Sequence, residues 1–233
     1  MEKTIVSEKE ANRSVFYEAP GSIASKNKKI SPYHFVFKRA LDIIFSAFGI
    51  LLISPILVLI AVLIKRGSKG PVFYKQKRVG RFGKEFHVFK FRTMIPDERP
   101  RKIIFTHKQR EQYRAEFKVD DDPRISRLGV FLRTTSLDEL PQLFNILRGE
   151  MSFIGPRPVL QIETELYKNN RDLLLSCVPG LTGFWQAYGR NNITYNSGRM
   201  EMELHYVQNK SLLLDIKILC RTFISVLSRD GAQ

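Results

Sequence analysis

The sequence holds few cysteines and histidines and places none of them in a metal-binding pattern. Its two cysteines, Cys177 and Cys220, lack ligand spacing, and its four histidines form no ligand pair. We therefore assign no metal to these residue types and predict two reduced, buried thiols instead of a disulfide. The sequence also contains no internal repeat.

Acidic side chains are scarce. The chain has 23 Asp and Glu residues against 38 Lys and Arg residues, which gives a formal net charge of +15. Such an excess implies an acidic partner, for which nucleic acid, an anionic membrane leaflet and a phosphorylated substrate are candidates. The aromatic residues are not interleaved with the basic ones on a recognisable platform, so we expect membrane lipids and a phosphorylated substrate, and no nucleic acid.

Charged side chains are absent from the whole stretch between Ile43 and Ile64. A straight helix of this length is about 33 Å long, close to the thickness of the hydrocarbon core of a bilayer. One straight membrane-spanning helix is the simplest interpretation. A signal peptide fits poorly, because the segment begins late, is too long and lacks a small-residue cleavage site.

Two features favour instead a helix that enters the membrane and returns to the same side. Pro55 lacks an N–H and crowds a carbonyl one turn earlier, so it kinks or breaks a helix, and the hydroxyl of Ser54 can satisfy a freed backbone group. Lys and Arg residues flank both ends of the segment, which is typical of cytoplasmic ends. Asp42 directly precedes the uncharged segment, and we expect it to form a local ion pair with Lys38 or Arg39.

These patterns predict an α+β, mainly helical fold in three parts: a mobile polar tail at 1–32, a re-entrant membrane helix hairpin at 33–66 and a small cytosolic catalytic domain at 67–233. Alternating residues around a glycine-containing turn predict a β-hairpin at 71–91. Helices follow, some of them amphipathic and interfacial. We expect them at 107–118, 126–133, 136–148 with Gly149 as C-cap, 159–176, from about 197, and 212–227, with a loop at 179–192.

Two adjacent carboxylates are the first candidates for chemistry. The motif from Ser136 to Glu139 is also a capping box, in which Ser136 caps a helix and Glu139 bonds back to it. The many cations nearby favour a site for a phosphorylated anion, with Mg²⁺ between carboxylates and phosphate. We therefore assign Asp138 and Glu139 as catalytic residues and metal ligands. As substrate or phosphate ligands we expect Lys90, Arg92, Arg124, Arg133, Arg157, Gln186 and Arg190.

Seven motifs in order resemble those of the bacterial sugar transferases, the monotopic polyprenyl-phosphate phosphoglycosyl transferases. The resemblance covers about residues 33 to 228 and implies the short form, a catalytic core without the additional N-terminal spanning helices of longer relatives. The motifs are Lys38-Arg-Ala-Leu-Asp42, Ser54-Pro55, Lys90-Phe-Arg-Thr-Met94, Asp122-Pro-Arg124, Thr135-Ser-Leu-Asp-Glu-Leu-Pro-Gln142, Gly155-Pro-Arg-Pro158, and Pro179-Gly-Leu-Thr-Gly183 with Gly189-Arg-Asn191.

The resemblance also implies a reaction. The membrane helix would be re-entrant and broken at Ser54 and Pro55, and Asp138 would be the nucleophile with Glu139 as its partner. In a ping-pong sequence that uses Mg²⁺, Asp138 would attack the β-phosphorus of a UDP-sugar, UMP would leave, and polyprenyl phosphate would take the phosphosugar. The product, a polyprenyl-diphosphate-sugar, would begin a capsule, exopolysaccharide or other glycan at the cytoplasmic face of the bacterial inner membrane.

Alternatives stay open at this point. A membrane-tethered module that binds nucleic acid or anionic lipid through its charge would do no chemistry and would bind with a steep salt dependence. A glycosyltransferase that forms a glycosidic bond would release UDP, not UMP. The sugar itself is open among glucose, galactose and N-acetylated or modified sugars, and a homodimer is open as a further partner.

Overall fold

The computed structural model describes residues 32–95, 106–107, 109–111, 122, 124–189 and 198–227, with the side chains of 32–35 set aside. All described residues belong to one compact unit of the chain, Ser31–Gln233. Two predictions fall mainly on other residues. The polar tail at 1–32 lies outside the described residues except for Pro32, and most of the helix expected at 107–118 does too.

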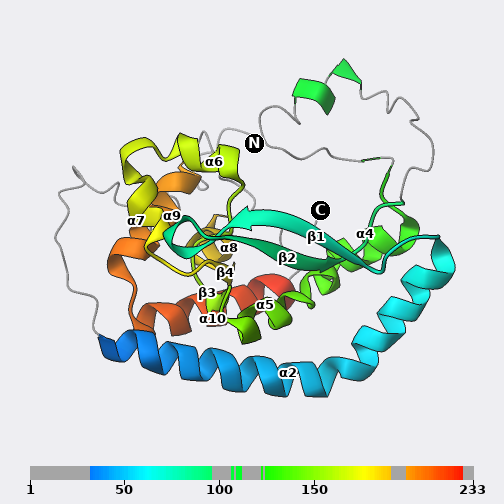
Figure 1. Ribbon diagram of the computed structural model, residues 1–233, viewed down its shortest axis with the longest axis horizontal. Coiled ribbons are helices and arrows are strands. Elements are labelled where there is room, and N and C mark those ends of the chain that lie inside the picture. Colours follow the sequence, from blue (N-terminus) through cyan, green and yellow to red (C-terminus); the bar gives the residue numbers. More distant parts are fainter. Residues whose placement is uncertain are drawn as a thin grey trace, which may run out of the picture. The chain divides into compact units, whose positions relative to one another are not determined.

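The apolar segment forms one long helix, α2 (Pro32–Gly67), which bends along its length (Figure 1). Among the described helices it alone is long and apolar enough to cross a membrane. The helix is continuous through Pro55, so the predicted break is not present, and the bend of α2 in Figure 1 agrees with the predicted kink. The hydroxyl of Ser54 donates to the carbonyl of Leu51 at 2.8 Å, which is the acceptor that Pro55 leaves without its N–H. This part of the prediction is confirmed.

Basic side chains at the start of α2 reach distant parts of the chain. Lys38 forms an ion pair of 2.6 Å with Asp215. Arg39 donates to the carbonyls of Ile146 and Leu147 at 2.6 and 2.8 Å, at the end of another helix. Cations are favourable at such a helix end, because its last carbonyls lack partners within the helix.

Asp42 is buried and also takes distant partners. It accepts hydrogen bonds from the hydroxyl of Ser152 and the N–H of Phe153, both at 3.1 Å. The predicted local ion pair with Lys38 or Arg39 is therefore wrong, because those cations are directed toward other elements. The start of α2 is fixed to the rest of the domain instead.

The predicted hairpin is confirmed as β1 (Phe73–Val79) and β2 (Glu85–Phe91), antiparallel and joined by the short 3₁₀ turn η1 (Arg81–Gly83). The outer edge of β2 is covered by the fully buried Asn145. Its side chain accepts from the N–H of Phe89 at 3.0 Å and donates to the carbonyl of His87 at 2.7 Å. This pairing holds β2 against the helix that carries Asn145.

Helices α4 (Arg127–Thr134) and α5 (Gln142–Arg148) follow, with the 3₁₀ turn η2 (Leu137–Glu139) between them. The predicted helix at 126–133 is confirmed, with Ser126 as its N-cap. The predicted end of α5 at Gly149 is confirmed too, since this glycine has φ 84. The predicted helix start near Ser136 is wrong, because Ser136 is left-handed at φ 56 and α5 begins after Pro141.

A second, parallel pair of strands was not predicted. β3 (Ser152–Ile154) pairs with β4 (Gly180–Thr182), and the expected loop at 179–192 contains β4 and the short helix α8 (Phe184–Tyr188). A Cβ on Gly155 would lie 2.4 Å from the carbonyl oxygen of Val178, so this contact requires glycine. The expected helix at 159–176 is divided into α6 (Gln161–Leu166), η3 (Lys168–Asn170) and α7 (Arg171–Leu175).

The described part ends with α9 (Arg199–Asn209) and α10 (Leu212–Leu227). α10 has the predicted bounds. It packs on α8 and on both short strands through residues such as the fully buried Ile218, and it exposes Leu213 and Phe223. Both cysteines are free, as predicted, but Cys177 is half-buried and Cys220 is exposed, so two buried thiols are not present.

Candidate active site

The two adjacent carboxylates lie on η2, between α4 and α5. The capping box does not form here. Ser136 makes no side-chain cap, and Glu139 bonds across to β2, where Nζ of Lys90 lies 2.6 Å from its Oε1. The interpretation of this motif as a plain helix cap is therefore wrong, and capping does not account for the two carboxylates.

Asp138 is buried, with 8% of its surface exposed. Burial raises the pKa of its carboxyl from 3.8 to about 6, since a charged carboxylate loses its hydration there. Lys90 opposes this rise, Glu139 adds to it, and Arg133 opposes it more weakly. A carboxyl with such a pKa is partly protonated near pH 6 and is more basic when ionised than an ordinary carboxylate, as catalytic carboxylates often are.

The structure brings two of the predicted cations to this carboxylate pair. Lys90 comes from β2, and Arg133 comes from the last turn of α4, where its Nε donates to Thr93 at 3.0 Å. The strand register places Tyr74 directly opposite Lys90, on the same face of the hairpin. Tyr74 is half exposed. No sequence pattern indicated Tyr74, and only the pairing of the two strands places it beside Lys90.

Two other predicted cations bond elsewhere. Arg92 is buried and donates to the carbonyls of Lys69 and Ser68 at 2.7 and 2.9 Å, which ties β2 to the chain just after α2. Arg124 pairs with Asp122, to which its Nε donates at 2.8 Å. Although burial alone would raise the pKa of Asp122, Arg124 lowers it below its usual value. Both arginines thus have structural partners, and their predicted phosphate contacts stay predictions.

A second group of predicted residues surrounds Trp185. The guanidinium of Arg199 lies 4.4 Å from the centre of the Trp185 ring and that of Arg157 lies 6.0 Å from it. Gln186 follows on α8, and its Oε1 is buried with no partner in the part of the chain that the structure describes. Arg190 lies outside the described residues. Arg199 was not predicted; its position four residues before Glu203 on one helix is the only signal that could have indicated it.

The hairpin connects the two groups. At one end of its inner face, Lys90 holds Glu139; toward the other end, Arg78 donates to the carbonyl of Pro158 at 3.2 Å and to Glu163 at 3.1 Å. Arg78 is four residues from Tyr74, the partner of Lys90, which corresponds to about 13 Å along a strand. The hairpin thus extends from the carboxylate pair to the turn that contains Arg157.

The carboxylates provide oxygen ligands of the type that Mg²⁺ prefers. Among the described residues, no group of three or more His, Cys, Asp or Glu side chains could hold a metal ion. Mg²⁺ commonly uses only one or two carboxylates and completes its shell with water and substrate phosphate oxygens. The adjacent Asp138 and Glu139, of which Asp138 is buried, would fit that arrangement as its carboxylate ligands.

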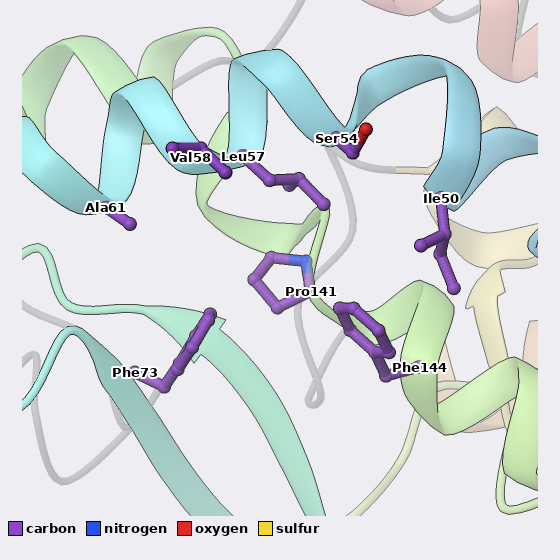
Figure 2. A pocket seen from close by; sticks show the side chains of 8 residues that line it. All are labelled: Ile50, Ser54, Leu57, Val58, Ala61, Phe73, Pro141 and Phe144. Atoms are coloured by element: carbon purple, nitrogen blue, oxygen red, sulfur yellow. The ribbon is translucent and has the colours of Figure 1, made fainter.

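An apolar pocket of about 230 Å³ adjoins the same segment. Figure 2 shows it between α2, the hairpin and α5, with Ser54 and Leu57 above, Phe73 at the lower left, Phe144 at the lower right and Pro141 between these two rings. Pro141 follows Glu139 by two residues, and Phe73 precedes Tyr74. The pocket therefore lies between the bent membrane segment and the chain that carries the carboxylates.

Comparison with known sequences places this arrangement in context. A family model described as "Bacterial sugar transferase" matches residues 33–229, most of the chain. The exopolysaccharide production protein ExoY of Sinorhizobium fredii is 41% identical over 213 residues, which cover 90% of this chain and 94% of that protein.

Longer proteins match as well. An uncharacterised sugar transferase of Haemophilus influenzae is 44% identical over 200 residues, which cover 84% of this chain and 42% of that protein. The undecaprenyl-phosphate galactose phosphotransferase of Salmonella typhimurium is 41% identical over 198 residues, with 84% of this chain and 41% of that protein covered. The chain thus spans less than half the length of these two relatives.

Proposed function

Because the chain belongs to the bacterial sugar transferase family, we propose that it transfers a sugar-1-phosphate from a UDP-sugar to polyprenyl phosphate, giving polyprenyl-diphosphate-sugar and UMP. The observation that carries the proposal is the buried Asp138, with a raised pKa, beside Glu139 and two cations. The names of relatives support it, since one is an undecaprenyl-phosphate galactose phosphotransferase and another an exopolysaccharide production protein.

The proposed reaction proceeds in two displacements at one phosphorus. In the first, an oxygen of ionised Asp138 forms a bond to the β-phosphorus of the donor, and the bond from that phosphorus to the bridging oxygen breaks. UMP leaves with the electron pair. In the second, a phosphate oxygen of the acceptor attacks the same phosphorus, and the acyl phosphate bond breaks to restore the carboxylate. The ping-pong order follows from this covalent step.

The neighbouring side chains have distinct roles in this scheme. Lys90 holds Glu139 in place and favours the ionised form of Asp138, which is the nucleophilic form. Arg133 adds positive charge where the phosphates arrive. Asp138 and Glu139 would hold Mg²⁺, which would neutralise phosphate charge when bound.

The apolar pocket supports a lipid acceptor. Its lining residues are almost entirely apolar, and it joins the bent part of α2 to the chain just after Glu139. We assign it to the first isoprenoid units of the acceptor, whose phosphate would then point toward Asp138. A soluble acceptor would gain nothing from such a surface, because the hydrophobic effect favours apolar ligands there.

The membrane arrangement is part of the proposal. We propose that α2 is re-entrant, with both ends at the cytoplasmic face of the bacterial inner membrane. The bend at Pro55, the bond from Ser54 to Leu51, and Lys or Arg residues on both flanks support this path. The product would begin the assembly of a capsule, an exopolysaccharide or another glycan.

The direct test is incubation of the membrane-embedded chain with single UDP-sugars, polyprenyl phosphate and Mg²⁺, with quantification of the nucleotide. The proposal predicts UMP and a diphosphate-linked lipid. Release of UDP would identify a glycosyltransferase instead. Binding of nucleic acid without any nucleotide release, and with no dependence on Asp138, would support a module that binds through charge alone.

A further inference from the structure

Glu203 is fully buried and lies at the centre of the second group of site residues. Its carboxylate accepts from Nε of Arg199 and from the backbone N–H of Arg157, both at 3.2 Å. The hydroxyl of Tyr167 is 3.5 Å away. A buried carboxylate is costly unless it is paired, so these contacts define its position closely. None of them is explained by the chemistry at Asp138.

These contacts set the position of two guanidinium groups. One Glu203 oxygen holds the side chain of Arg199 against the ring of Trp185, and the other holds the backbone of Arg157 in the turn Gly155–Pro158. The prolines on either side of Arg157 leave this turn few other conformations. The carboxylate of Glu203 therefore fixes the backbone from which the Arg157 side chain extends.

The same helix is connected to the membrane segment. Tyr206, one turn after Glu203 on α9, donates to Asp215 at 2.8 Å, and Asp215 pairs with Lys38 of α2 at 2.6 Å. Tyr206 also packs with Ile154, at the end of β3 just before Gly155. α9 thus contacts the Arg157 turn at two points and reaches α2 through one further residue.

We propose that Glu203 and Tyr206 are positioning residues that hold Arg157 at a fixed position relative to the membrane helix α2. This inference rests on the proposed function and on the prediction from the sequence that Arg157 binds phosphate of the UDP-sugar. Neither residue touches the reacting atoms. They act through Arg157, so their loss weakens donor binding and leaves acceptor binding unchanged.

The test uses the full chain in lipid nanodiscs with the variants Glu203→Gln and Tyr206→Phe. Glu203→Gln keeps the shape but has only one acceptor oxygen, so it can accept from Arg199 or from the N–H of Arg157, but not from both as Glu203 does. The matched controls are Glu201→Gln, an exposed position on the same helix, and Tyr188→Phe, a half-exposed tyrosine with no hydrogen bond from its hydroxyl among the described residues.

Steady-state UMP release gives the first readout. We expect the KM for the UDP-sugar to rise roughly tenfold in Glu203→Gln, and less in Tyr206→Phe, with the KM for polyprenyl phosphate unchanged. In an Arg157→Ala background, Glu203→Gln should raise the KM for the UDP-sugar little further, because both substitutions act on the contact between Arg157 and the donor phosphate. A full additive loss, or equal increases in both KM values, would overturn the inference.

Fluorescence gives a second readout that needs no substrate. The chain has one tryptophan, so its emission reports directly on the group around Trp185. Glu203→Gln should shift the emission and increase quenching by acrylamide several-fold, while Glu201→Gln matches the parent. Unchanged fluorescence in a folded Glu203→Gln variant contradicts the inference. A parent chain that releases no UMP would instead refute the proposed function, and the fluorescence test would still stand.

Discussion

Nζ of Lys90 lies 2.6 Å from Oε1 of Glu139 and joins β2 to the turn that carries Asp138. Among the neighbouring charges, Lys90 is also the one that most favours ionisation of Asp138. The same lysine therefore holds one carboxylate in place and keeps the other in its nucleophilic form.

Removal of this lysine should change the pH dependence of the reaction. In Lys90→Met the pKa of Asp138 should rise further above about 6, since burial and Glu139 then act without the main opposing charge. We expect the acidic limb of the kcat/KM profile to move up by roughly one pH unit. Lys77→Met is the matched control on the same hairpin, because Lys77 pairs with the exposed Glu85, away from the carboxylate pair. Profiles that coincide for Lys90→Met and the parent would contradict this role.

The ionised carboxylate of Asp138 should lower the free energy of unfolding at neutral pH. Because folding raises the pKa of Asp138, protonated Asp138 favours the folded state at low pH, and this contribution is lost as the pH rises through about 6. Asp138→Asn should therefore abolish UMP release yet raise the free energy of unfolding at pH 7.5 by about 3 kcal/mol.

Thermal unfolding in detergent measures this effect at several pH values. The gain in Asp138→Asn should shrink as the pH falls from about 6 toward 4, and it should be nearly absent below pH 4, where Asp138 is protonated in both the folded and the unfolded chain. Membrane association should be unchanged. A variant that is less stable than the parent at neutral pH, or that still releases UMP at a near-normal rate, would speak against the assignment.

The pocket assignment makes a prediction for Phe144. Phe144→Ala should raise the KM for polyprenyl phosphate about fivefold through lost apolar contact, with the KM for the UDP-sugar unchanged. Leu147→Ala is the control, because Leu147 lies on the same helix, is 37% exposed as Phe144 is, and does not line the pocket. Equal effects of the two substitutions would contradict the assignment of the pocket to the lipid acceptor.

The path of α2 through the membrane can be tested by labelling. In a background without Cys177 and Cys220, single cysteines at Ser25 and Lys69 should react with an impermeant maleimide from the same, cytoplasmic side. Pro55→Ala removes the cause of the bend, so a larger share of Ser25→Cys should label from the opposite side. Labelling of the two positions from opposite sides in the parent chain would establish a straight spanning helix.

Local rules predicted much of the fold. The hairpin, α4, the end of α5 at Gly149 and the bounds of α10 follow from alternation, capping and apolar pattern. The pair of β3 and β4 was missed because each has three residues and their partners are far apart in the chain. The capping box failed because Ser136 adopts a left-handed conformation that no local pattern signals.

The site was predicted less completely for a related reason. Residue type indicated Asp138, Glu139 and the cations, but only tertiary contacts separate their roles. Arg92 binds carbonyls after α2, Arg124 binds Asp122, and Glu203 organises Arg157 from a distant helix. Such partners depend on how elements pack, which spacing along the chain does not encode.

The covalent step is the central claim, and it can be observed directly. The chain is mixed with a UDP-sugar and Mg²⁺ without acceptor, quenched in acid, digested and analysed by mass spectrometry. We predict a sugar-phosphate mass on the peptide that contains Asp138, with one UMP released per adduct, and loss of the adduct on addition of polyprenyl phosphate. UMP release that requires the acceptor, with no modified peptide, would contradict the account.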